Sequence, residues 1–223
     1  MSQTRPPIPD HVVAGFREVP PATIGHTRTV GFVDPAIRPV YRLRRVVVGP
    51  AATLKLTPGD TTHTRAALTD LREGEVLVID AGGVGPAACW GEMTSLCVKV
   101  RNGAGVVIDG FVTDVVEIED MDVPTWSRGV SALVGRRLTR EGGAGVPVQC
   151  GGVVVNPGDL VVADDNGIVV IAPEEAEAAY AVAREYEDRS PHQRKWILGG
   201  GLLADLVGLD SAGIAAKVAE RGY

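Results

Sequence analysis

The sequence has few aromatic residues and no long apolar run. Aromatic side chains make up 4% of the 223 residues, although apolar side chains make up 45%. The core is therefore expected to consist mainly of Val, Ala, Leu and Ile, which suits an α/β or β-rich fold with tightly packed small side chains. No segment approaches the roughly 20 apolar residues that a membrane-spanning helix needs. We therefore predict a soluble protein with no membrane partner.

Cysteine is scarce as well. The three cysteines, Cys89, Cys97 and Cys150, form neither a C-x-x-C pair nor an even disulfide framework. They are predicted to be small buried side chains in a reducing compartment. The first twelve residues, MSQTRPPIPDHV, contain no apolar stretch of the kind found in secretory signals. Both observations predict a cytoplasmic protein.

The sequence has fewer basic than acidic side chains, so its formal net charge is −6 at pH 7. This balance argues against nucleic acid as a partner, since no basic stripe is available to neutralise phosphates. We interpret the one dense basic run as a solvated strand edge or a subunit contact. That run contains Arg38, Arg42, Arg44 and Arg45.

The common zinc, nucleophile and nucleotide motifs are also missing. The four histidines are scattered, without the spacing of zinc ligands. No G-x-S-x-G turn is present. The loop Gly82-Gly83-Val84-Gly85 matches neither a Walker loop nor a dinucleotide fingerprint, so nucleotide binding is not expected.

The length favours one large domain with terminal extensions. Residues 1–22 are predicted to form an arm with a short helix, residues 23–189 the main domain, and residues 190–223 a helical tail. Ser190-Pro191 is expected to end the long helix that precedes it. Predicted strands are 46–48, 52–56, 75–80, 105–109, 123–128, 145–150, 151–155, 160–163 and 167–171, the last four as hairpins; predicted helices are 11–18, 60–71, 91–102, 174–189 and 212–220.

Carboxylates gather after the predicted strand at 105–109. Five of them, with no Lys or Arg between, lie at Asp109, Asp114, Glu117, Glu119 and Asp120. Either this segment turns outward into water, or a cation that the sequence does not encode lies there. A divalent metal is the obvious candidate.

Magnesium takes oxygen ligands, keeps several waters and uses only one or two carboxylates. Asp114 and Glu117 fit this preference, because residues three apart share one face of a helix. Glu92, at the start of the predicted helix 91–102, could act as a base or hold a water at the metal. The alternative is structural, with Asp114 as a helix N-cap and Glu117 as its capping-box partner.

Short motifs along residues 30–185 together resemble one known family. It contains regulator of ribonuclease activity A (RraA) and the class II aldolases acting on 4-hydroxy-4-methyl-2-oxoglutarate and 4-carboxy-4-hydroxy-2-oxoadipate. The matching pieces are 33–39, Gly49-Pro50-Ala51, Pro58-Gly59-Asp60, 74–83, Trp90-Gly91-Glu92, 105–110, Arg128-Gly129, Gly151-Gly152-Val153, 156–159 and 164–167. The tail, at Gly208-Leu209-Asp210 and 217–223, is similar to the longer aldolases.

The resemblance implies an α/β fold of the ββα-sandwich, swivelling-domain-like type with a helical C-terminal extension. It also implies a homotrimer or homohexamer with active sites at subunit interfaces, a small carbonyl substrate, and Mg²⁺ or Mn²⁺ as cofactor. By matched position, Glu92 is the catalytic acid or base, Asp114 the metal-binding aspartate and Glu117 the last acid. A carboxylate of a neighbouring subunit, here Glu187 or Glu185, would complete the metal's outer shell.

For the substrate, the resemblance implies that backbone N–H groups around Gly91 and the glycine-rich turn at Gly82 and Gly83 hold its carboxylate. The chain departs from the aldolases at Thr113, where they have an arginine that binds pyruvate. Threonine offers one hydroxyl and no charge, whereas arginine offers a bidentate fork. Arg128 is the nearest candidate replacement in sequence, although its Arg-Gly match also suggests a structural role.

Three functions remain open at this point. The first is a divalent-metal lyase with an altered substrate, in which Thr113 joins Glu92 and Asp114 in the catalytic set. The second is an ordinary aldolase or oxaloacetate decarboxylase that takes its arginine from elsewhere in space. The third is a non-catalytic binding protein similar to the ribonuclease regulator.

Overall fold

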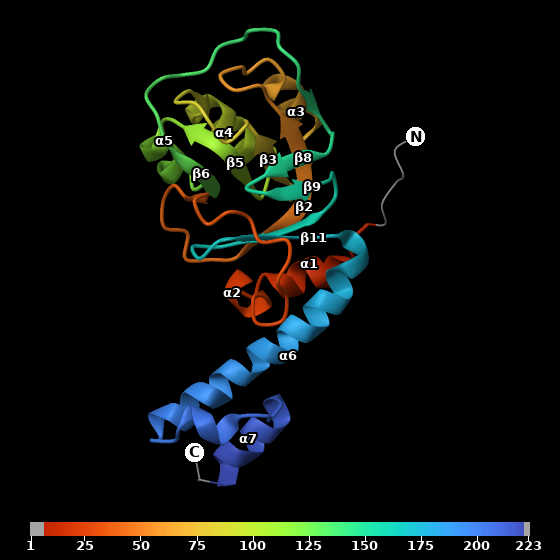
Figure 1. Ribbon diagram of the computed structural model, residues 1–223, viewed down its shortest axis with the longest axis vertical. Helices are drawn as coiled ribbons and strands as arrows, with labels where there is room; N and C mark the ends of the chain where they lie inside the picture. Colours follow the sequence, from red (N-terminus) through yellow and green to blue (C-terminus); the bar gives the residue numbers. More distant parts are fainter. Residues whose placement is uncertain (1–6, 221–223) are drawn as a thin grey trace.

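A nine-stranded sheet forms the centre of the computed structural model, which describes residues 7–220 (Figure 1). Its order is β1-β6-β5-β3-β2-β10-β11, with β4 paired to β5 and β7 paired to β2. The inner strands β2, β3, β5 and β6 run parallel, whereas β10 and β11 are antiparallel. The strands are β1 Arg38–Pro39, β2 Val47–Lys55, β3 Val76–Asp80, β4 Ala88–Trp90, β5 Gly105–Val112, β6 Thr125–Val130, β7 Gly143–Ala144, β10 Leu160–Ala163 and β11 Ile168–Ile171.

Two layers cover the two faces of this sheet. Leu77 and Ile79 of β3 pack in one cluster with side chains of helices α3 (Thr64–Asp70), α4 (Glu92–Val100) and α5 (Val115–Asp120). Val76 and Val78 of the same strand pack in another cluster with the hairpin β8–β9 (Val148–Cys150, Val153–Val155). Because neighbouring residues of a strand face opposite ways, one apolar run fills both cores. The predicted α/β sandwich is confirmed.

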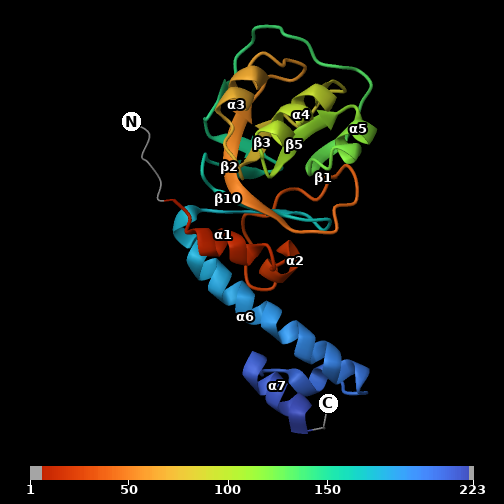
Figure 2. The ribbon, with the colours of Figure 1, turned by 180° about the vertical axis from the view of Figure 1, so that it is seen from behind.

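The remaining helices lie beyond β10 and β11 (Figures 1 and 2). Helices α1 (Asp10–Phe16) and α2 (Pro21–Ile24) pack with the first half of α6 (Pro173–Leu198) against these strands. The far half of α6 extends away from the sheet and packs with η1 (Leu203–Leu206) and α7 (Ser211–Glu220) around Trp196. Within residues 7–220, no helix has both the length and the apolarity to cross a bilayer. The first six residues of the predicted arm and residues 221–223 of the tail lie outside the described part.

Several sequence predictions were wrong in detail. The residues 46–48 and 52–56 do not form two strands, because β2 runs on through Gly49 and Pro50. A side chain at Gly49 would overlap the carbonyl oxygen of Gly74, so glycine allows the two segments to approach closely. Cys97 is exposed, whereas the other two cysteines are buried as predicted.

The predicted helix break at Ser190-Pro191 is also wrong. Helix α6 continues through Pro191 to Leu198, across the predicted boundary between main domain and tail. Proline removes one i to i−4 hydrogen bond, but the packing of Trp196 against α7 supports the turn that follows. Tertiary contacts therefore override the local breaking signal.

Replacing Pro191 with alanine should stabilise the protein. Pro191 is exposed within α6, and alanine would restore the missing backbone donor. We expect the free energy of unfolding to rise by about 2 kcal/mol, measured by chemical denaturation. Pro173→Ala is the control, because a proline at the first helical turn lacks no needed donor and should give no gain. An unchanged or lower stability of Pro191→Ala would contradict this account.

Candidate functional site

A cavity of about 340 Å³ opens beside the N-terminus of α4. It brings together four of the predicted site residues: Gly91, Glu92, Thr113 and Asp114. They meet because β4 and β5 are parallel, with Trp90 opposite Val112, so the residues after each strand emerge at the same edge. The other lining residues are Thr61, Thr64, Arg65, Leu68, Ala88, Cys89, Trp90, Met93, Thr94, Val134, Gly135 and Arg137.

Asp114 connects the two strand ends. Its Oδ2 accepts the backbone N–H of Glu92 at 2.9 Å, and its Oδ1 accepts the Thr113 hydroxyl at 3.1 Å. The carboxylate therefore lies at the N-terminus of α4, where the free N–H groups and the helix dipole favour an anion. The sequence predicted an anion at this helix, and one of its N–H groups is taken by the protein's own carboxylate.

The backbone of Asp114 is unusual. Its φ of 56° lies in the left-handed region, which costs energy for any residue other than glycine, although Asp tolerates it better than most. Asp114 does occupy the N-cap position of α5, but its side chain makes no cap hydrogen bond. The predicted capping box with Glu117 is therefore wrong, because the carboxylate of Asp114 faces α4 instead. Strained residues of this kind are concentrated at functional sites.

Gly91 permits this arrangement. A Cβ atom at this position would overlap Oδ2 of Asp114 and lie 2.8 Å from Cγ2 of Thr113. The Gly91 backbone is held by Thr94, whose hydroxyl accepts from the Gly91 N–H at 3.0 Å and donates to its carbonyl at 2.8 Å. The glycine of the Trp90-Gly91-Glu92 motif is thus required by the close approach of Asp114.

The structure does not bring the other predicted residues to this cavity. Glu117 is exposed on α5 and is not part of the lining. Glu187 lies on α6 and accepts a hydrogen bond of 2.6 Å from Thr23 of the same chain. Glu185 instead accepts both the backbone N–H and the hydroxyl of Ser211, at the start of α7. Their roles at a metal stay predictions.

Arg128 belongs to a separate ion-pair network. Its guanidinium donates to Asp109 and, at 2.7 Å, to Asp34. Its contacts with the carboxylates of Asp109 and Asp34 raise the pKa of Arg128. Asp109 also accepts the Gly151 N–H at 2.6 Å. Asp109 is therefore compensated in space by a cation that its neighbours in sequence do not provide. The Asp109 side chain lies next to Gly83. Arg128 and Gly83, two of the predicted substrate-binding residues, therefore belong to a cluster away from Asp114.

Asp60 is the first residue of the predicted helix 60–71, but α3 begins only at Thr64, and the carboxylate of Asp60 has a different role. Its buried carboxylate accepts the N–H groups of Thr62 at 2.8 Å, Leu138 at 3.0 Å and Arg140 at 2.7 Å. We call residues 131–142 the anchored loop, because this carboxylate holds it beside α3. Burial by itself would raise the pKa of Asp60, but these hydrogen bonds outweigh it and lower the pKa.

Sequence reasoning missed two arginines of the cavity. Arg65 comes from α3 and Arg137 from the anchored loop, and both line the space that also holds Glu92 and Asp114. The sequence carried only a weak signal for them, since neither lies in a motif that the resemblance matched. Their proximity to Asp114 depends on how the anchored loop packs.

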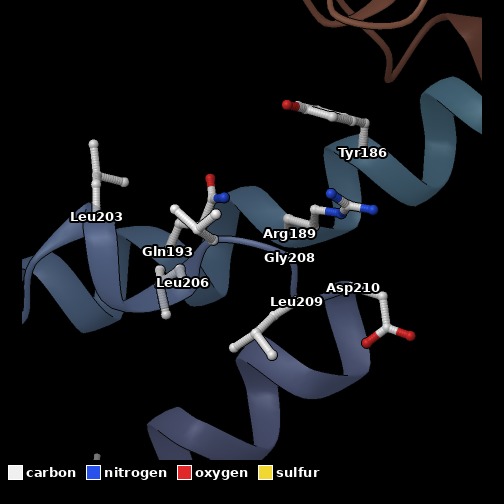
Figure 3. Close-up of a pocket in the computed structure, with 9 residues that line it drawn as sticks. Tyr186, Arg189, Gln193, Leu203, Leu206, Gly208, Leu209 and Asp210 are labelled. Atoms are coloured by element: carbon white, nitrogen blue, oxygen red, sulfur yellow. The ribbon is translucent and has the colours of Figure 1, made fainter.

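A second cavity, of about 410 Å³, lies between α6 and the segment that leads to α7 (Figure 3). Arg189 lies over the ring of Tyr186 at 4.8 Å, and that ring stacks on His26 with centroids 4.6 Å apart. None of the predicted site residues lines this cavity. We therefore take the cavity at Asp114 as the candidate site.

The donor set suits a hydrated oxygen-ligand cation. Each carboxylate oxygen of Asp114 accepts one hydrogen bond, which leaves lone pairs on an exposed side chain. Within residues 7–220, no group of three or more His, Cys, Asp or Glu side chains lies close enough to enclose a metal. Mg²⁺ needs no such group, because it binds through one or two carboxylates and keeps its waters. The residues fit Mg²⁺ or Mn²⁺ on these terms.

Comparison with known proteins gives consistent matches. The family model described as "RraA-like: Aldolase/RraA" matches residues 22–170. An uncharacterized protein of Methanocaldococcus jannaschii is 32% identical over 78% of this chain and 84% of its own length. A protein of Halalkalibacterium halodurans named "Putative 4-hydroxy-4-methyl-2-oxoglutarate aldolase" is 36% identical over 56% of this chain and 59% of its own.

Among solved structures, Streptomyces coelicolor RraAS2 is similar over most of both chains. Its TM-score is 0.74 at 30% identity, covering 85% of this chain and 98% of that one. That protein is described as an unusual member of the RNase ES inhibitor RraA protein family.

Placing a methyl group at Gly91 should distort the site. In Gly91→Ala the new Cβ would displace Asp114 and Thr113, at a cost of about 1–3 kcal/mol in unfolding free energy. Gly143→Ala is a matched control, because a Cβ there would meet only Val146 at 3.6 Å, an ordinary contact. Denaturant titration of both variants measures the difference. Equal stabilities would show that the strand ends do not approach as closely as the structure has them.

The carboxylate of Asp60 should make the free energy of unfolding depend on pH. Because the pKa of Asp60 is lowered in the folded state, its stabilising contribution to the free energy of unfolding is present above about pH 4. That contribution is lost as the pH falls toward the pKa of the folded state. Asp60→Asn carries no charge to lose, so its unfolding free energy should fall less steeply between about pH 5 and 3, and should be lower at pH 7. Asp70→Asn, on the exposed face of α3, is the control and should leave the slope unchanged. Parallel pH profiles for wild type and Asp60→Asn would overturn this assignment.

Proposed function

The chain belongs to the RraA-like (Aldolase/RraA) family, and we propose that it is a divalent-metal-dependent lyase acting on a small oxo acid or related carbonyl compound. One observation carries the proposal: Glu92, Thr113 and Asp114 line a single cavity. A relative whose name is that of an aldolase supports the same class of reaction. The reaction would be cleavage of a carbon–carbon bond, as in a retro-aldol step or a decarboxylation.

Asp114 is the residue that would hold the metal, Mg²⁺ or Mn²⁺. When bound, such a cation polarises a carbonyl oxygen and stabilises the negative charge that develops on cleavage. The protein fixes the direction of the Asp114 carboxylate through the Glu92 N–H and the Thr113 hydroxyl. A carboxylate held in this way needs little rearrangement when a ligand binds.

Glu92 is the proposed proton-transfer group. It is partly buried at the first position of α4 and lines the cavity beside Asp114. Its side chain has no hydrogen-bond partner within residues 7–220, so its carboxylate is available to take a proton from a substrate hydroxyl or return one to a carbanion. Thr113 lines the same cavity beside Asp114, and its side chain carries no charge, which supports an altered substrate preference.

We also propose that the active site is completed in a homotrimer or homohexamer. Met93, Leu96 and Val100 form an exposed apolar stripe on α4, at the spacing of one helical face. Met93 and the exposed Val134 also line the cavity, so a neighbouring subunit that covered this stripe would lie at its mouth. Such a subunit could bring Glu187 or Glu185 to the metal, as the family resemblance suggested.

The alternative is a non-catalytic regulatory protein. The similarity to Streptomyces coelicolor RraAS2 over 98% of its length supports this reading. A protein of this kind would need neither the proton-transfer group nor the strained aspartate. The two functions are separated by whether the chain turns over a substrate in a metal-dependent way.

Loss of the Asp114 carboxylate should abolish catalysis. We expect the wild-type protein to decarboxylate oxaloacetate or cleave 4-hydroxy-4-methyl-2-oxoglutarate with Mg²⁺ or Mn²⁺, and to show no turnover in EDTA. In Asp114→Ala, kcat/KM should fall by about 10²-fold or more. Asp120→Ala removes an exposed carboxylate on the same helix and should keep full activity. Mn²⁺ titration by calorimetry should show binding that Asp114→Ala lacks. Turnover that persists in EDTA, or a kcat/KM in Asp114→Ala equal to that of the wild type, would refute the proposal.

A further inference from the structure

We propose that Arg137, assisted by Arg65, binds a carboxylate of the substrate in the cavity at Asp114. The substrate class is therefore a small organic acid, held by its anionic end away from the carboxylates of Glu92 and Asp114. This inference rests on the proposed function for the reaction, but the binding step can be tested separately.

Both arginines lie in the cavity without a counter-charge. Within residues 7–220, no Asp or Glu oxygen lies within 4.0 Å of either guanidinium, whereas Arg28, Arg45, Arg128, Arg184 and Arg189 all have such a partner. Glu92 and Asp114 are the acidic residues of the lining, and they come from different elements than the arginines. The lining therefore carries two acidic and two basic side chains. A ligand with an anionic group and a carbonyl oxygen matches both.

The position of Arg137 is fixed by its neighbours on both sides. The Arg136 N–H donates to the Gly59 carbonyl at 2.9 Å, and the Arg136 carbonyl accepts from Thr61 at 3.0 Å. On the other side, the Leu138 N–H donates to Asp60 at 3.0 Å. A side chain on such a backbone loses less freedom when a ligand binds, which favours affinity. Asp60 is then a positioning residue for Arg137.

The surroundings favour a charge-assisted contact with a small ligand. The arginine fork matches a carboxylate with two parallel hydrogen bonds. Leu68, Trp90 and Met93 provide apolar surface in the same cavity. The volume of about 340 Å³ is at the lower end of ligand pockets, which fits a small acid.

The test is the binding of malonate, an unreactive dicarboxylate, to the full-length protein without added metal. Calorimetry should show that Arg137→Gln weakens malonate binding about tenfold or more, as expected for loss of a charge-assisted pair. Arg137→Lys keeps the charge but not the bidentate fork, so its malonate affinity should lie between those of the wild type and Arg137→Gln. The neutral analogue malonamide should bind weakly and equally to all three proteins.

Arg136→Gln is the matched control. Its side chain is exposed, it is not part of the cavity lining, and the backbone contacts of residue 136 do not need it. This variant should bind malonate as wild type does. Thermal unfolding of each variant checks that the anchored loop is intact. Equal malonate affinities of Arg137→Gln and Arg136→Gln would overturn the inference.

The outcomes separate this inference from the proposed function. Unchanged malonate affinity in Arg137→Gln, together with metal-dependent turnover that needs Asp114, would refute the role of Arg137 and leave the lyase intact. Weakened malonate binding without any turnover would keep the carboxylate site and refute the lyase. If Arg137 binds the carboxylate and the protein is also a lyase, Arg137→Gln should raise KM for an acid substrate more than it lowers kcat. Introducing Thr113→Arg into Arg137→Gln should then restore part of the malonate affinity.

Discussion

The carboxylate of Asp114 at the N-terminus of α4 is the interaction on which the site depends. It joins the end of β5 to the start of the helix that follows β4, and so sets the distance between two strand ends. Two local features follow from it. Residue 91 must be glycine because a Cβ would overlap the carboxylate, and Asp114 must adopt a left-handed backbone. The left-handed backbone of Asp114 persists because the parallel strands and the core beneath them hold both strand ends in place.

A second carboxylate, that of the buried Asp60, organises the other side of the cavity. Asp60 accepts backbone N–H groups from Thr62, just before α3, and from Leu138 and Arg140 in the anchored loop. These hydrogen bonds hold the anchored loop, a long connection without regular structure, in one position. Long loops with such fixed backbones commonly carry binding residues. Asp114 and Asp60 thus act in similar ways. Each is an acid that receives backbone N–H groups, and each orders one part of the cavity.

The distribution of charge connects the fold to the proposed chemistry. The acidic cluster that the sequence displays is divided in space, because Asp109 pairs with Arg128 while Asp114 faces the cavity. The arginines that line the cavity come from segments that precede and follow the cluster by many residues. A lyase needs a group that polarises the carbonyl, a group that moves a proton and a group that orients the substrate. The cavity contains side chains suited to each task.

The layers of the fold could be predicted from the amino-acid sequence. Apolar runs such as 105–109 and the turn residues between the hairpin strands predicted the buried strands, and the short motifs predicted the family. The sequence also suggested Gly91, Glu92 and Asp114 as candidate site residues, through the cluster of carboxylates and the motifs of the family that the chain resembles. These features are local in sequence, so periodicity and motif spacing can reveal them.

The partners of the charged groups could not be predicted in this way, because they depend on tertiary contacts. Arg128 was a candidate for substrate binding, with a structural role as the alternative, and in the structure it pairs with Asp109 and Asp34. Pro191 was expected to end α6, but packing around Trp196 carries the helix on. The cavity's arginines were not found from the sequence, because Arg137 reaches the site through contacts between residues nearly eighty positions apart. Such pairings depend on how loops return to the sheet. They are long-range contacts that local sequence patterns do not encode.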